Sequence, residues 1–203
     1  MSGIIAQNTL DSSGLIKAPA GGGAWTFISK LTSDGSDSDL SFTSGIDSTY
    51  KEYIFYFVNI HPETDNKKFQ FNGSTDGGSN YNVAKTSSYF SAFHDEGNAY
   101  TSLGYNATYD LAQGTGFDTI SIQASADSDH CLNGYLHLFN PSSTTFIKHY
   151  IARMCSNNEG DMTQDEFSGG YLNTTSAVDA IQFKMDSGEI QAGSIFLHGL
   201  STS

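Results

Sequence analysis

The stretch IDSTYKEYIFYFVNIHP, residues 46–62, decides the fold class of this chain. Its centre, YIFYFV, is apolar at every position and is followed one residue later by an isoleucine. Side chains alternate between the two faces of a strand, so this run predicts one face with Tyr53, Phe55 and Phe57. The other face would then carry the remaining apolar residues, Ile54, Tyr56, Val58 and Ile60. Both faces need cover, which a second sheet supplies on one side and a loop, an arm or another subunit supplies on the other.

Strand signals recur along the whole chain. The candidate strands are Trp25–Leu31, Leu40–Thr43, Tyr53–Ile60, Lys68–Asn72, Tyr89–Phe93, Thr119–Ala124, Gly134–Phe139, Thr145–Met154, Ala180–Met185 and Ser194–His198. In AIQFKM the alternation places Ile181, Phe183 and Met185 inward. Turn-forming segments separate the strands, and LGYNATYDLAQGTG, residues 103–116, is the expected place for short helical turns. These features predict an all-β fold, an antiparallel β-sandwich that is jelly-roll-like.

The chain is expected to divide into two parts. Residues 1–24 show little periodicity and predict an extended N-terminal arm, whereas residues 25–203 predict a single β-sandwich domain with one core. Two interpretations of the arm stay open: it docks on a neighbouring subunit or particle surface, or it packs on its own domain. Its apolar residues, which a purely disordered tail would not need, are Ile4, Ile5, Leu10, Leu15 and Ile16.

Composition bounds the function. Aromatic residues make up 13% of the chain and charged residues 15%, a profile typical of β-structure with a neutral polar surface. The net charge is −13 with nine Lys and Arg, so the chain lacks the basic patch that nucleic-acid binding requires. It also lacks a secretory leader pattern and any apolar stretch near the about 18 residues of a membrane span. The sequence predicts no nucleic-acid partner, no membrane and synthesis in a cytoplasm.

Three internal segments and both ends of the chain carry a family resemblance. The segments are FNGSTDGGSNYN (71–82), GYLHLFNPSSTTFIKHYIAR (134–153) and GGYLNTTSAVDAIQFKMDSGEIQAGSIFLHGL (169–200). At the ends, SGLIKAPAGGGAWTFISK is an arm that closes on a glycine patch and a tryptophan, and SIFLHGLSTS is a strand with a small-residue turn. Together they resemble a group of virion structural proteins of marine tailed bacteriophages, of the cyanophage and pelagiphage kind. The resemblance implies a part of a virus particle more firmly than it implies which part.

That resemblance implies a non-enzymatic protein on the virion surface, assembled in the cytoplasm of the bacterial host. The first hypothesis is a capsid decoration or cement protein that self-associates, with a homotrimer as the expected state. Its arm would dock on the major capsid protein or on tail or fibre proteins. The alternative is an adhesin domain of a tail or head fibre that binds a host-surface glycan or protein through its long loops.

Two aspartate-rich segments have the residue types of calcium loops. The first holds Asp34, Asp37 and Asp39, and the second is Asp127–Asp129 beside His130. Alternating carboxylates can supply oxygen ligands, but neither segment has the full EF-hand spacing with its downstream Glu. A solvated turn is the favoured interpretation of both. The sequence therefore predicts no metal site and no cofactor.

Candidate catalytic groups are few. His94 adjoins Asp95 and Glu96, yet neighbours in a strand point to opposite faces, so an acid–base pair would need a loop conformation. None of the histidines has a metalloenzyme spacing; they are His61, His94, His130, His137, His149 and His198. A further set of carboxylates falls in a segment predicted to be a short polar loop, namely Glu159, Asp161, Asp165 and Glu166. No catalytic residue is predicted, and the chain is expected not to be an enzyme.

The glycine-rich segment NGSTDGGSNYN, residues 72–82, has two interpretations. A tight hairpin connection is favoured, and a display loop for a carbohydrate or protein is the alternative. Tyr81 and Tyr89 nearby suit stacking on sugars as well as filling the sandwich. The two cysteines, Cys131 and Cys155, are expected to be reduced and buried in or beside strands.

Overall fold

Strand β3, Glu52–Pro62, lies inside the larger of two antiparallel sheets and is the element that the apolar run predicts. The computed structural model describes residues 24–201, which contain strands and turns but no helix. The other strands are β1 Trp25–Thr32, β2 Leu40–Phe42, β4 Lys67–Ser74, β5 Lys85–Asp95, β6 Thr101–Tyr105, β7 Asp118–Ala124, β8 Leu132–Phe139, β9 Lys148–Asn157, β10 Met162–Leu172, β11 Ala180–Met185 and β12 Ile190–Leu200. This confirms the all-β fold.

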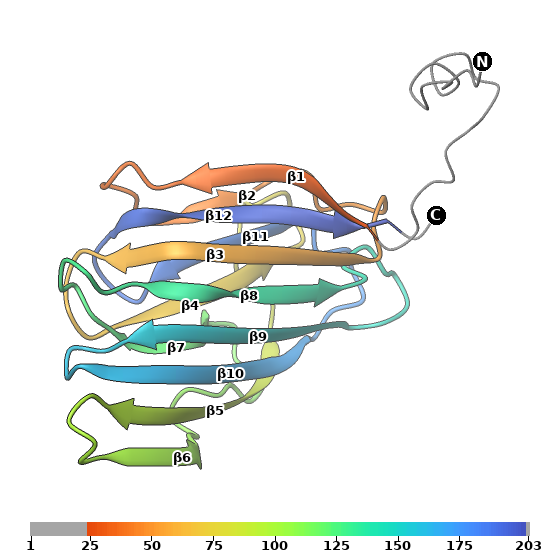
Figure 1. Ribbon diagram of the computed structural model, residues 1–203. Coiled ribbons are helices and arrows are strands. Elements are labelled where there is room, and N and C mark those ends of the chain that lie inside the picture. Colours follow the sequence, from red (N-terminus) through yellow and green to blue (C-terminus); the bar gives the residue numbers. More distant parts are fainter. Residues whose placement is uncertain (1–23, 202–203) are drawn as a thin grey trace, which may run out of the picture.

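Two sheets stack face to face, as Figure 1 shows with the large sheet in front. The large sheet has the order β1-β12-β3-β8-β9-β10-β5-β6, and the small sheet has the order β2-β11-β4-β7. The β-sandwich prediction is confirmed. The small sheet is made of the strands that follow or precede β1, β12, β3 and β8 in sequence, and its edge strand β7 packs against β9, β10 and β5 of the large sheet. That order is compatible with a jelly roll, which stays a prediction.

An aromatic cluster fills one half of the space between the sheets. Phe183 of β11 lies at its centre and is fully buried. Its ring centroid lies 5.0 Å from that of Phe57 and 5.1 Å from that of Phe55, both in edge-to-face arrangement. The rings of Phe42, Phe69 and Phe71 also surround it. The predicted inward positions of β11 are confirmed, because Ile181 and Met185 are fully buried as well.

A polar network fills the other half, between β7 of the small sheet and the extended part of the large sheet. Glu166 of β10 accepts hydrogen bonds from Tyr89 Oη at 2.5 Å, from Ile122 N at 2.7 Å and from Ser121 Oγ. Burial raises the pKa of the Glu166 carboxyl to about 7. These bonds tie the two sheets together across the interior.

Two more buried ionisable groups belong to the same region. Asp118 accepts hydrogen bonds from Tyr150 Oη and, at 3.0 Å, from Ser87 Oγ, and burial raises the pKa of its carboxyl. The Lys85 Nζ donates to Asn72 Oδ1 at 2.6 Å, and burial lowers the pKa of this amine to about 8. Tyr89 is fully buried in this region. Of its two interpretations, the structure therefore supports filling of the sandwich and not stacking on sugars.

The alternation predicted for β3 is wrong at its end. Asn59 adopts a positive φ of 53°, and the pairing with β8 shifts register between Phe57 and Ile60. This bulge turns Ile60 to the inner face, where it is fully buried, and leaves Val58 exposed. The inner face of β3 is as predicted at Tyr53, Phe55 and Phe57.

Two strands were not predicted and two connections differ from expectation. β10 replaces the expected polar loop, and β6 begins the segment in which helical turns were expected. Strands β4 and β5 lie in different sheets, so the glycine-rich segment between them is a crossing connection and not a hairpin.

Within residues 24–201 no helix is long and apolar enough to cross a membrane. The N-terminal arm, residues 1–24, lies outside the described residues except for Ala24.

Candidate functional site

A row of aromatic and cationic side chains crosses the outer face of the large sheet, the face turned away from the small sheet. Hydrogen-bonded partners on neighbouring strands form it in register. From β1 to β6 the row is Lys30, Phe196, Tyr56, Tyr135, Arg153, Phe167, Phe90 and Tyr105. Because adjacent strands lie about 4.8 Å apart, it spans on the order of 30 Å. We call this set the outer row.

Cations in the outer row lie against aromatic rings. The Arg153 guanidinium is 4.9 Å from the ring centroid of Phe167, and it donates two hydrogen bonds to Asp165, at 2.9 and 2.7 Å. Phe167 stacks in turn on Phe90, with ring centroids 4.7 Å apart and planes only 3° from parallel. These contacts hold a flat hydrophobic surface in one conformation, which lowers the entropy cost of covering it.

A second row lies two residues away from the outer row along each strand, or three on β1, where the pairing with β12 shifts register. It consists of Phe27, His198, Ile54, His137 and Ile151. Its middle is covered, since Ile54 is only 2% exposed and the Trp25 ring lies 5.5 Å from that of His137. Its ends are open, with Phe27 56% and Ile151 49% exposed. Within the described residues, the outer face of the large sheet is therefore covered at Ile54 but not at Phe27 and Ile151.

A shallow hollow separates the two rows near Gly169. Its volume is about 360 Å³, and its walls include Tyr135, Ile151, Phe167 and Phe90. Gly169 pairs with Ile151 across the strands, so the sheet has no side chain at a position where its neighbours are large. The hollow is within the size range of ligand sites.

The apolar surface continues to the free edge of the large sheet. Strand β6 is the edge strand, and Leu103 and Tyr105 on it are 77% and 59% exposed. Phe90 on the neighbouring strand is 41% exposed. An exposed edge strand flanked by large apolar side chains presents unpaired backbone groups together with hydrophobic surface, which is typical of a protein-contact site.

Alternation along β9 and β10 explains why these residues face outward. On β9 the positions 148, 150, 152 and 154 are buried, and the intervening positions through Cys155 are exposed. Glu166 on β10 points into the interior, so the next residue, Phe167, must point out. Outward-facing aromatics at these positions are not needed for the core, which the inner residues already fill.

The aspartates of the first candidate calcium loop are used inside their own turn. Asp37 accepts a hydrogen bond from the backbone N–H of Asp34, and Asp34 accepts two from Ser36, from its backbone N–H and its hydroxyl. Asp39 accepts hydrogen bonds from Ser38 and Ser41. The three carboxylates are thus capping groups, in agreement with the solvated-turn interpretation.

The structure separates the predicted carboxylate cluster. Asp165 lies on the outer face with Arg153, and Glu166 lies in the interior, so the two neighbours serve different networks. Asp161 belongs to the turn before β10, where its backbone N–H donates to the carbonyl of Asn158. The prediction of one polar loop is wrong because β10 begins at Met162 and buries every second residue.

The histidines and cysteines lie in unrelated places. His94 and Asp95 are on β5, which gives them the strand conformation that opposes an acid–base pair. His137 is bound by Glu52 through an Nδ1–Oε1 contact of 2.6 Å. Cys131 and Cys155 are both free thiols, and Cys155 is exposed on β9, so the expected burial is wrong for it.

The outer row was missed from the sequence. Each strand shows its outward residues as one half of an alternating pattern, for example Tyr135, His137 and Phe139 in β8. Only the register between strands places the outward residues of eight strands at one level. Comparison of the chain with protein-family models, with curated proteins and with solved structures finds no match.

Proposed function

We propose that this chain is a non-enzymatic structural protein of a tailed-bacteriophage particle, a capsid decoration or cement protein that associates with further copies of itself. One observation carries the self-association: the outer row, with an exposed apolar surface on both sides of it, spans the whole large sheet. Surfaces of this kind mark contact sites in proteins that must stay soluble. The link to a virus particle rests on the family resemblance of the sequence.

The proposed partner of the outer row is a second copy of this chain. The surface combines apolar rings with charges of both signs: Lys30 lies over Phe196, Arg153 pairs with Asp165, and Glu52 contacts His137. The positive groups of one copy can therefore meet the negative groups of another. The net charge of −13 opposes close approach of two copies, but physiological salt screens charges beyond about 8 Å. A trimer is the proposed state, and the N-terminal arm is the proposed contact to the major capsid protein or to tail or fibre proteins.

A second candidate function is supported by the hollow near Gly169. Flat rings beside a guanidinium group are chemistry that binds sugar rings, by stacking and by hydrogen bonding to hydroxyls. The stacked pair of Phe90 and Phe167 with Arg153 has this form. The candidate is an adhesin domain of a tail or head fibre that binds a host-surface glycan.

Copy number per particle tests the proposal. Quantitative mass spectrometry of purified particles, referenced to the major capsid protein, is expected to find hundreds of copies. A few to a few dozen copies would place the chain on the tail or on a fibre and favour the adhesin. Absence from purified particles would contradict both candidates.

A further inference from the structure

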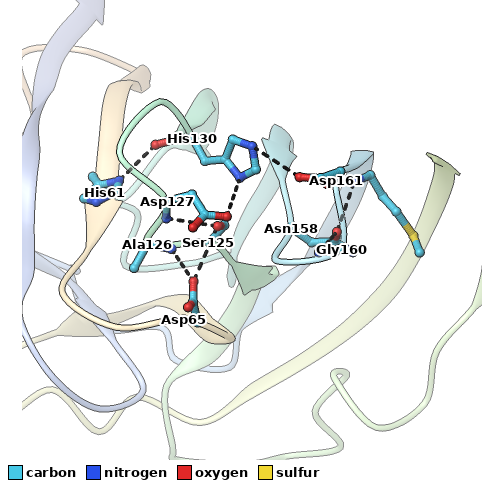
Figure 2. A network of polar contacts seen from close by, with 10 residues as sticks. His61, Asp65, Ser125, Ala126, Asp127, His130, Asn158, Gly160 and Asp161 are labelled. Atoms are coloured by element: carbon cyan, nitrogen blue, oxygen red, sulfur yellow. Dashed lines mark hydrogen bonds and ion pairs between the residues drawn. The ribbon is translucent and has the colours of Figure 1, made fainter. Parts of the chain in front are cut away.

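We infer that Asp127, His130 and Asp161 form a binding site for one divalent transition-metal ion of the zinc class. His130 precedes β8 in the loop that follows β7, whereas Asp161 comes from the turn between β9 and β10. One ligand atom from each of the three residues lies within 4.8 Å of the other two. Figure 2 shows the imidazole of His130 placed between the two carboxylates.

The distances suit a shared ion better than direct pairing. His130 Nδ1 lies 3.7 Å from Asp127 Oδ2, and His130 Nε2 lies 4.0 Å from Asp161 Oδ1. Both exceed hydrogen-bond length. Zinc binds nitrogen and carboxylate oxygen at about 2.0 to 2.2 Å, so two ligands of one ion lie roughly 3 to 4 Å apart. A metal ion binds one ring nitrogen, and Nδ1 is the proposed ligand atom, so the exposed Asp161 carboxylate would have to turn from Nε2 toward the ion at Nδ1.

An unsatisfied polar atom points to a missing partner. The Nδ1 atom of His130 is buried without a hydrogen bond, and the side chain is only 12% exposed. Within residues 24–201, neither carboxylate makes a hydrogen bond or ion pair other than its contact with His130. Buried polar groups are nearly always paired, so the orphan ring nitrogen calls for a partner, and the two exposed carboxylates beside it are available as further ligands.

Both loops are held in place by their backbones. The N–H of Ser125 donates to the carbonyl of Asn157 at 3.3 Å, which joins the first loop to the end of β9, next to the turn that carries Asp161. Asp65 anchors the first loop by accepting from Ala126 N at 2.7 Å, and His61 Nδ1 contacts the carbonyl of His130 at 2.9 Å. The ligands therefore project from a fixed frame, which reduces the ordering cost of binding.

The donor set decides the class of ion. Calcium takes six to eight oxygen ligands, whereas imidazole nitrogen suits zinc and its transition-metal neighbours. Three protein ligands leave the fourth tetrahedral position for water. The ion would link the small sheet, through the loop after β7, to the turn between β9 and β10 of the large sheet. The calcium interpretation of Asp127–Asp129 is thus replaced by a site that omits Asp129.

Titration of the full chain with ZnCl₂ tests the site. Calorimetry is expected to show one saturable site with a Kd on the order of micromolar, and thermal unfolding is expected to shift to higher temperature with zinc and back with EDTA. The Asp161→Asn and His130→Gln variants are expected to lose affinity by about ten-fold or more. Asp161 is exposed, so its variant folds and keeps the measurement interpretable.

Two control variants make the result specific. Asp129→Asn removes a neighbouring carboxylate of the same loop. His149→Ala removes an exposed histidine at the opposite end of β9, where it pairs with Tyr171. Both are expected to bind zinc as the wild-type chain does. Absence of zinc binding, equal loss in either control, or binding of CaCl₂ in place of ZnCl₂ would each overturn the inference.

Discussion

Replacing Phe183 by alanine is expected to lower the free energy of unfolding by about 3 to 5 kcal/mol, the range for deleting a buried aromatic side chain. Phe183 is fully buried and its ring contacts five other phenylalanine rings, from β2, β3 and β4. Alanine leaves a cavity between the two sheets, where these rings pack together. Chemical denaturation at fixed pH measures the loss.

Two controls separate the cavity from other effects. Phe183→Leu fills most of the volume and is expected to cost much less than the alanine variant. Phe146→Ala removes a ring that is 69% exposed and is expected to change the free energy of unfolding by less than about 0.5 kcal/mol. Equal stability of Phe183→Ala and the wild-type chain would show that the aromatic cluster is not the core.

Raising the pH from about 5 to about 7.5 is expected to destabilise the fold through Glu166. Burial raises the pKa of this carboxyl from its ordinary 4.5 to about 7. Between these values the folded chain holds the proton and the unfolded chain has lost it, so the free energy of unfolding falls as pH rises. The whole difference corresponds to about 3 kcal/mol. Asp118, whose pKa burial also raises, contributes in the same direction.

The Glu166→Gln variant isolates this contribution. Glutamine has nearly the same shape and does not titrate, so the variant is expected to lose most of the slope between pH 5 and 7.5. Groups with lowered pKa values do not interfere: Asp76 titrates near 2, and the effect of Lys85, with its pKa of about 8, lies at higher pH. Denaturation midpoints of both proteins across this range give the slopes. An identical slope in the variant would contradict the role of Glu166.

Period-two patterns allowed most strands to be predicted from the sequence. A packed sandwich needs apolar residues at alternate positions, and this pattern predicts β11 from AIQFKM and β3 from YIFYFV. The sequence does not predict β10 because its inward positions carry the polar residues Gln164, Glu166 and Ser168, and a polar segment is typical of a loop. These polar residues are buried because β7 and β9 supply partners such as Ser121 and Ser156, and nothing local in the sequence shows that pairing.

Both surface sites depend on contacts between segments distant in sequence. The outer row needs the register of eight strands, and the metal site needs Asp161 beside a loop more than thirty residues earlier. The bulge at Asn59 is a third case, since a single positive φ moves Ile60 from one face to the other. Alternation predicts which residues share a strand face but not which strands are neighbours.

Sedimentation velocity at micromolar concentration tests the central claim, that the outer row is a self-association surface. The full chain is expected to sediment as an oligomer, with a trimer as the proposed state, and the Phe90→Glu/Tyr105→Glu variant as a monomer, because two charges would be buried at the contact. Both side chains are substantially exposed, so the variant is expected to fold. Phe146→Glu, which alters an exposed ring in the loop between β8 and β9, should remain oligomeric. A monomeric wild-type chain, or a double variant that stays oligomeric, would contradict the claim.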